Sequence, residues 1–142
     1  MLQRLLKFFV VLPMVLLLTA CNGYEHETIP NVRVNFTIYP DSPNYPNLNF
    51  IGGHEYVTGG VQGIIIYRVD QYTFVAYDRA CPYDWEEQDS WLWVDESGIL
   101  ITDSLCGSVF NILDGSVISG PSKYNLKFYK TMYDGLRLRI YN

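Results

Sequence analysis

The feature that most constrains this chain is a series of short β-branched and aromatic segments, each ended by a turn rich in Gly, Pro, Asn or Asp. Beyond the first 30 residues, no segment keeps the 3.6-residue period of an amphipathic helix. Strands are expected at residues 32–38, 55–57, 63–69, 72–77, 91–94, 99–102, 109–113, 117–118, 126–131 and 136–141, with brief ones near Leu48 and Phe50. Many short strands at close spacing predict an all-β antiparallel sandwich or barrel-like domain.

The first 20 residues have the composition of a secretory signal. Arg4 and Lys7 precede an apolar run over residues 8–18, which is too short for a membrane-spanning helix. The run ends in Leu-Thr-Ala-Cys at residues 18–21, which resembles the lipobox of bacterial lipoproteins. In that class of protein a peptidase cuts before the cysteine, here Cys21, which then carries lipid. An ordinary signal peptide followed by a chance cysteine is the alternative.

The resemblance implies three parts: a signal peptide (1–20), a lipidated tether (21–30) and a single β domain (31–142). The expected location is the bacterial cell envelope, at the outer membrane and facing the periplasm or the cell surface. Removing residues 1–20 leaves 8 basic residues against 15 acidic ones, a net charge of −7. Such an acidic chain is not expected to bind nucleic acid, and its attachment to the membrane would depend on the acyl chains.

Two cysteines remain in the predicted domain, and each lies in a turn-rich loop that is followed by a β segment. The first loop is Ala-Tyr-Asp-Arg-Ala-Cys-Pro at residues 76–82, and the second begins as Cys-Gly-Ser-Val-Phe at residues 106–110. Turns follow at Asp114-Gly115 and at Gly120-Pro121. An even pair of cysteines outside the cytoplasm usually forms a disulfide.

This order of motifs resembles the Rieske family of 2Fe–2S domains over residues 59–142. The tail adds to the likeness with Gly120-Pro121-Ser122, Leu126, Tyr129 and Asp134-Gly135-Leu136. The resemblance implies an antiparallel β-sandwich with a small lobe made by the two cysteine loops. In that family Cys-x-His in one loop and Cys-x-x-His in the other hold the cluster.

The two histidine positions of that pattern hold Tyr83 and Val109 here. Valine has no lone pair, and a tyrosine phenolate would be an unusual ligand. The resemblance therefore implies a domain that has lost its cluster and has no cofactor or metal. The alternative is an atypical 2Fe–2S centre on Cys81 and Cys106.

Oxygen ligands from Asp84 and Ser108 could stand in for the imidazoles, but they suit this kind of centre poorly. The histidines of the chain, His26 and His54, do not occupy a ligand position of the motif. Loss of the cluster is thus the favoured interpretation.

In the family fold both cysteines meet at one iron, so a chain without the cluster would leave the two sulfurs side by side. The resemblance then implies a Cys81–Cys106 disulfide, which closes a loop of about 25 residues and is worth roughly 3 to 4 kcal/mol by chain entropy. Two free thiols are one alternative. A redox-active disulfide is another, although the Cys-x-x-Cys spacing is absent.

The tip of the two loops is the expected recognition surface, with Trp85, Gly107 and Ser108 as candidate residues. Trp91 and Trp93 are expected to share one face of a strand, with one tryptophan side packing on the core. The sequence has no nucleophile–base pair, phosphate-binding loop or zinc spacing, so an enzyme is not expected. A non-catalytic binding or structural module with an envelope protein as partner is the first hypothesis, and an electron-transfer protein is the second.

Overall fold

The computed structural model describes residues 29–142, so the predicted signal peptide (1–20), most of the tether and the lipidation site Cys21 lie outside the described residues. The described part contains ten strands and one 3-10 helix, and it contains no α-helix. The strands are β1 (Asn35–Ile38), β2 (His54–Val57), β3 (Ile64–Arg68), β4 (Phe74–Asp78), β5 (Leu92–Val94), β6 (Leu100–Asp103), β7 (Val109–Asn111), β8 (Val117–Ser119), β9 (Phe128–Tyr133) and β10 (Leu138–Tyr141), and the 3-10 helix is η2 (Pro46–Asn49). This part of the chain has no helix with the length and hydrophobicity that a membrane crossing requires.

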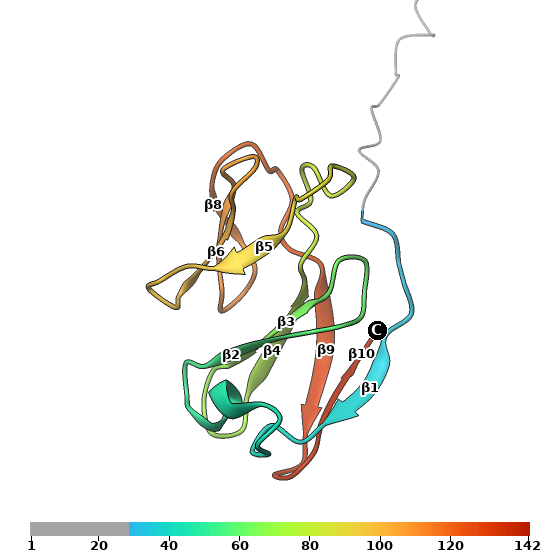
Figure 1. Cartoon of the computed structure of the whole chain (residues 1–142), viewed down its shortest axis with the longest axis vertical. Helices are drawn as coiled ribbons and strands as arrows, with labels where there is room; N and C mark the ends of the chain where they lie inside the picture. The colour runs from blue at the N-terminus through green and yellow to red at the C-terminus, as the bar shows by residue number, and fades with distance from the viewer. Residues whose placement is uncertain (1–28) are drawn as a thin grey trace, which may run out of the picture.

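The strands form two antiparallel sheets of unequal size (Figure 1). The large sheet has the order β1-β10-β9-β4-β3-β2, and the small sheet has the order β5-β6-β7-β8. The small sheet is inserted between β4 and β9, so that it forms a separate lobe at one end of the large sheet (Figure 1). The predicted all-β class is confirmed.

Strand β3 lies between two hydrophobic cores, because all five of its residues are buried. Ile64 and Ile66 face a first core that the large sheet encloses as it curls, together with Leu48, Phe74, Tyr129, Leu138 and Ile140. Ile65 and Tyr67 face a second core, which the small lobe covers with Leu92, Ile101, Phe110 and Ile112. Successive residues of β3 thus pack into different cores, and the strand connects the two lobes.

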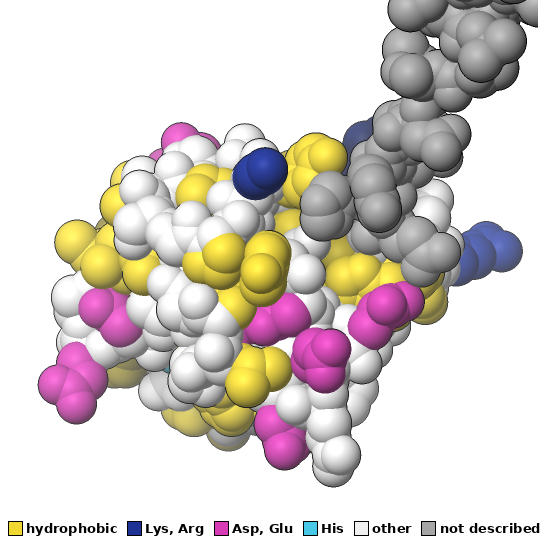
Figure 2. Space-filling view, turned by 90° about the horizontal axis from the view of Figure 1, so that it is seen from above, with side chains coloured by type: hydrophobic (Ala, Val, Ile, Leu, Met, Phe, Trp, Pro, Cys, Tyr) yellow, Lys and Arg dark blue, Asp and Glu magenta, His cyan; other side chains and the backbone are white. Residues whose placement is uncertain are grey.

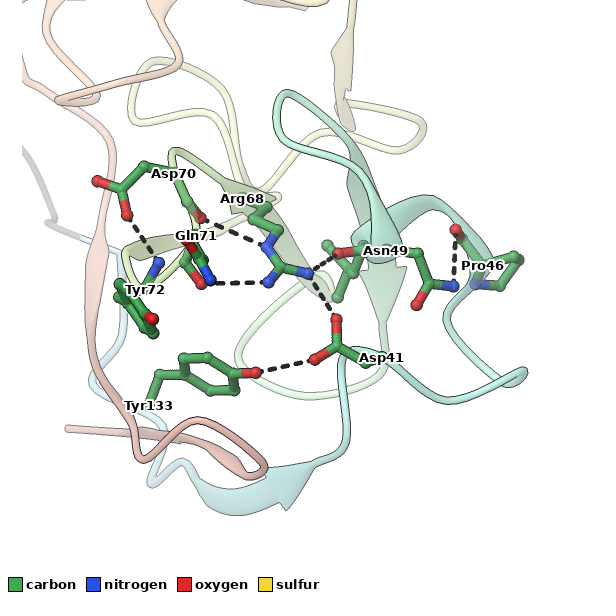
Figure 3. Close-up of polar contacts among 9 residues, drawn as sticks. Asp41, Pro46, Asn49, Arg68, Asp70, Gln71, Tyr72 and Tyr133 are labelled. Atoms are coloured by element: carbon green, nitrogen blue, oxygen red, sulfur yellow. Dashed lines mark hydrogen bonds and ion pairs between the residues drawn. The ribbon is translucent and has the colours of Figure 1, made fainter.

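Arg68 ends β3 and ties the loop after β1 to the large sheet (Figure 3). Its guanidinium is buried, and Nη1 donates to Asp41 Oδ1 at 2.6 Å and to the Leu48 carbonyl at 2.8 Å. Nη2 donates to the Gln71 carbonyl at 3.1 Å, in the turn between β3 and β4. The hydrogen bonds that Arg68 and Tyr133 donate to the Asp41 carboxylate lower the pKa of Asp41.

The strands predicted near Leu48 and Phe50 are wrong, because this stretch forms the 3-10 helix η2. Pro46 occupies the first turn of that helix, where its missing N–H is not needed, whereas a strand would have needed it. Leu48 is fully buried beneath the helix, and Phe50 is 70% exposed beyond it. The two apolar side chains therefore do not share one face, as residues two positions apart in a strand would.

Candidate functional site

The first cysteine loop starts from a buried carboxylate at the end of β4. Asp78 is fully buried, and its Oδ2 accepts hydrogen bonds from the Val61 N–H and the Tyr129 hydroxyl, each at 2.7 Å. Its Oδ1 accepts from the Gln62 N–H at 3.1 Å and from the Ala80 N–H at 3.0 Å. Asp78 therefore holds the backbone that leads into Cys81 against the loop between β2 and β3.

Burial raises the pKa of Tyr129, and the hydrogen bond and the charge of Asp78 act in the same direction. The phenol consequently stays protonated and remains a donor at neutral pH. Gly60 comes so close to this pair that a Cβ at its position would lie 2.3 Å from Asp78 Oδ2. Its φ of 62° also lies in the region that glycine adopts most readily.

The second cysteine loop connects β6 to β7 and is organised by Asp103. This residue is 2% exposed, and its Oδ1 accepts from the Leu105 N–H at 2.6 Å and from the Cys106 N–H at 3.2 Å. The Gly107 N–H donates to the Asp103 carbonyl at 3.0 Å, and the Asp103 N–H donates to the Ser108 carbonyl at 2.9 Å. A short loop with this many internal hydrogen bonds fixes the place of Cys106.

A third segment, after β8, packs against the second loop. Gly120 has a φ of 97°, and a Cβ there would lie 2.5 Å from Ser108 Cα. The Ser122 N–H donates to Ser108 Oγ at 3.1 Å. The Gly120-Pro121 turn therefore supports the loop that carries Cys106.

The two loops bring Cys81 and Cys106 together, with their Sγ atoms 3.6 Å apart. Cys81 is fully buried and Cys106 is half-buried. Burial raises the pKa of Cys81, the Tyr83 backbone N–H opposes this effect, and Asp84 and Cys106 add to it. The predicted pair thus meets in space, while the disulfide between them stays a prediction.

Two aspartates complete the group around the thiols. One ligand atom each from Cys81, Asp84, Asp103 and Cys106 lies within 4.8 Å of all the others. The fully buried Ser90 hydroxyl donates to Asp84 Oδ1 at 2.7 Å and lies 3.3 Å from Asp103 Oδ2. The result is a compact set of two sulfur and two oxygen ligands.

The positions that hold the cluster histidines in the Rieske pattern carry no nitrogen ligand here. The Tyr83 side chain is 51% exposed, and Val109 lies in β7, where it pairs with Thr102 and Ser119. Within residues 29–142 the single histidine is His54, in β2, where its ring packs edge-on against Tyr56. The described residues therefore offer two thiols for one iron of a Rieske centre and no imidazole at the motif positions for the other, so they do not fit that centre.

The predicted tip residues differ in how much of them reaches the surface. Trp85 is half-buried, and its carbonyl accepts from Gln62 Nε2 at 2.7 Å. Gly107 is exposed, whereas Ser108 is fully buried and its hydroxyl lies 3.1 Å from Cys106 Sγ. The side chain of Ser108 thus supports the loop from inside, and a recognition role for these residues stays a prediction.

A pocket of about 640 Å³ opens beside the thiols. Its lining residues are Pro82, Tyr83, Asp84, Trp85, Glu86, Glu87, Leu105 and Cys106. Figure 2 looks onto this end of the molecule and shows acidic side chains beside hydrophobic ones. The approach to Cys106 is therefore acidic.

Trp91 and Trp93 share one face, as predicted, and Leu92 on the other face is fully buried. The prediction that one tryptophan side packs on the core is wrong, because the two side chains are 44% and 42% exposed. They lie instead against the Arg79 guanidinium, which is 4.3 Å from the Trp93 ring and 4.4 Å from the Tyr56 ring. Cation–π contacts thus hold the tryptophans on the surface.

Asp103 is the site residue that the sequence analysis did not identify. Its position three residues before Cys106 could have indicated an acceptor for the N–H groups of a tight loop. Nothing in the local sequence indicates that it also lies beside Cys81. The sequence disfavours Asp84 as a ligand, yet the structure places it next to both thiols.

Comparison with solved structures shows what fold these elements form. A chain from the complex of reduced oxygenase and oxidized ferredoxin in carbazole 1,9a-dioxygenase is similar, with a TM-score of 0.52 and 18% identity over 76% of this chain and 93% of that one. An NADH-dependent nitrite reductase small subunit from Mycobacterium tuberculosis has a TM-score of 0.48 and 16% identity over 79% of this chain and 97% of that one. No family profile matches the sequence, and no curated protein is significantly similar to it. The chain has an all-β, Rieske-like fold, as predicted.

Proposed function

We propose that this chain is a lipid-anchored protein of the bacterial cell envelope, in which residues 31–142 form a single Rieske-like domain without a 2Fe–2S centre. The domain serves as a non-catalytic module that binds another envelope protein or supports its structure. Lipid on Cys21 attaches it to the membrane, and nucleic acid is not among its partners. The sequence before residue 29 is the basis for the anchor.

The observation that carries the cluster-free assignment is the replacement of both imidazoles. A Rieske centre needs two nitrogen ligands on its second iron. Val109 has only an aliphatic side chain, and Tyr83 is half exposed to solvent. The family's usual cofactor would therefore lack two of its four protein ligands, and with them its route to electron transfer.

A binding role is supported by the surface next to the two loops. Tyr83 and Leu105 are 51% and 55% exposed, and they lie beside Glu86 and Glu87 at the rim of the pocket. Exposed aromatic and aliphatic groups surrounded by charges are common at protein interfaces. A partner with an apolar contact area and a basic rim would complement this surface.

The test uses the full-length chain, expressed in a bacterium with its own N-terminal segment and extracted in mild detergent. Iron and acid-labile sulfide are assayed, and the mass of the polypeptide is recorded under denaturing conditions. We expect no iron, no sulfide, and a mass that corresponds to loss of residues 1–20 and addition of lipid. The Cys21→Ser variant should lack the lipid mass and should retain the mass of residues 1–20.

An electron-transfer protein with an atypical 2Fe–2S centre is the second candidate. The 3.6 Å between the Cys81 and Cys106 Sγ atoms favours it, because two thiolates on one iron lie at a similar separation. Two irons and two sulfides per chain, with a brown-red colour that fades on reduction, would establish this alternative and exclude the cluster-free module.

A further inference from the structure

The two aspartates beside the thiols have no positively charged partner in the described part of the chain. The ion pairs within residues 29–142 are Arg68–Asp41 and Arg137–Asp134, and neither involves Asp84 or Asp103. The Ser90 hydroxyl has a single proton, so it cannot donate to both carboxylates at once. Asp103 is almost fully buried; its Oδ1 accepts two backbone N–H groups, whereas its Oδ2 has, among the described residues, only the Ser90 hydroxyl at 3.3 Å, so a bound cation would stabilise its charge.

The four ligand atoms are also close enough to surround one ion. A tetrahedral zinc site with Zn–S of about 2.3 Å and Zn–O of about 2.1 Å has edges of roughly 3.4 to 3.8 Å. The two Sγ atoms are already 3.6 Å apart, and no pair in the group exceeds 4.8 Å. The widest pair therefore needs to close by only about 1 Å.

From these observations we infer that Cys81, Asp84, Asp103 and Cys106 bind a single Zn²⁺ ion. Two thiolates and two carboxylates around Zn²⁺ leave a net charge of −2, which is also the charge of a four-cysteine zinc site. Mg²⁺ and Ca²⁺ prefer six or more oxygen ligands, so a set with two sulfurs selects against them. The site replaces the iron–sulfur centre as the clamp between the two loops, and the inference rests on the cluster-free function proposed above.

The surroundings fit a resident ion. Ser90 orients the carboxylates, and the Leu105 and Cys106 N–H groups fix Asp103 Oδ1. Such outer hydrogen bonds hold first-sphere ligands in place. The pocket with Glu86 and Glu87 at its rim gives a cation an acidic path to Cys106.

The first experiment is a native mass spectrum of the full-length chain, purified in detergent without chelators or added metal. One zinc per chain, in exchange for the protons of the thiols, is the expected result. A mass lower by two hydrogens with no metal would show a disulfide in the resting protein; it would overturn the zinc site and leave the cluster-free module intact. Two irons with two sulfides would overturn the zinc site and the proposed function together.

The second experiment assigns the ligands by titrating reduced, chelator-treated protein with Zn²⁺ against a chromophoric competitor. Asp84→Asn and Asp103→Asn should each weaken Zn²⁺ binding by about 100-fold, since a missing ligand costs at least as much as a missing outer hydrogen bond. Glu96→Gln removes the same charge from an exposed turn and should change the affinity by less than about twofold. Equal affinities for all three variants would overturn the assignment.

Co²⁺ gives a readout of geometry that does not depend on stability. The wild-type chain should show the strong visible absorption of tetrahedral Co²⁺ and a thiolate-to-cobalt charge-transfer band. Asp84→Asn should lose the first feature and keep the second, whereas Cys81→Ser/Cys106→Ser should lose both. Asp84 is only half-buried, so its variant remains informative even if Asp103→Asn does not fold. An Asp84→Asn spectrum identical to that of the wild type would exclude the carboxylate as a ligand.

Discussion

Replacing Asp78 by alanine should be among the most destabilising single changes in this domain. The carboxylate accepts four hydrogen bonds, at 2.7, 2.7, 3.0 and 3.1 Å. Asp78→Ala would leave two buried donors, the Ala80 N–H and the Tyr129 hydroxyl, without a partner. Each costs about 1 to 3 kcal/mol, whereas the partly buried Val61 and Gln62 N–H groups can turn to water at a smaller cost. The expected loss is about 4 kcal/mol of the free energy of unfolding.

Tyr129→Phe is the matched control, because it removes one donor and leaves Asp78 with three. We expect it to cost about 1 kcal/mol. Urea unfolding at neutral pH, followed by tryptophan fluorescence, measures both values, and an unchanged m-value validates the comparison. If Asp78→Ala does not fold, Asp78→Asn keeps one acceptor and should give an intermediate value. An Asp78→Ala cost within about 1 kcal/mol of the Tyr129→Phe cost would refute the reasoning.

Two further changes test the packing of the second loop and the ion pair of the large sheet. Gly120→Ala places a methyl group 2.5 Å from Ser108 Cα, whereas Gly135 has a similar φ, 91° against 97°, and no neighbour within 4 Å of its Cβ position. Differential scanning calorimetry should show that Gly120→Ala costs about 2 kcal/mol more than Gly135→Ala, and equal costs would contradict the close approach. Since the folded state lowers the pKa of Asp41 below its ordinary value of 3.8, the ion pair with Arg68 contributes stability above that pH and loses it as the pH falls through the lowered pKa. Urea unfolding measures the difference in the free energy of unfolding between wild type and Asp41→Asn. This difference should be constant above about pH 5 and shrink below about pH 4. A constant difference down to about pH 2 would be inconsistent with this ion pair.

Local sequence patterns predicted most strands because alternation and turn residues report which face of a strand is buried. The hairpin predicted at residues 63–69 and 72–77 is the β3–β4 pair, at 64–68 and 74–78. The pattern failed at residues 46–49, where apolar spacing resembled a strand but proline favoured a helical turn. It also failed for Trp91 and Trp93, whose surroundings depend on Arg79, in the segment that follows β4.

By itself, the sequence determined the all-β class, the two cysteine-bearing loops and the absence of histidine from the positions where the Rieske pattern has it. These features follow from residue identity and from spacing over a few positions. The group of Cys81, Asp84, Asp103 and Cys106 was decided by tertiary structure, because it joins loops that start from different sheets. Burial of the second core between β3, β4 and the small sheet sets the separation of those loops. The spacing of residues along the chain does not predict that distance.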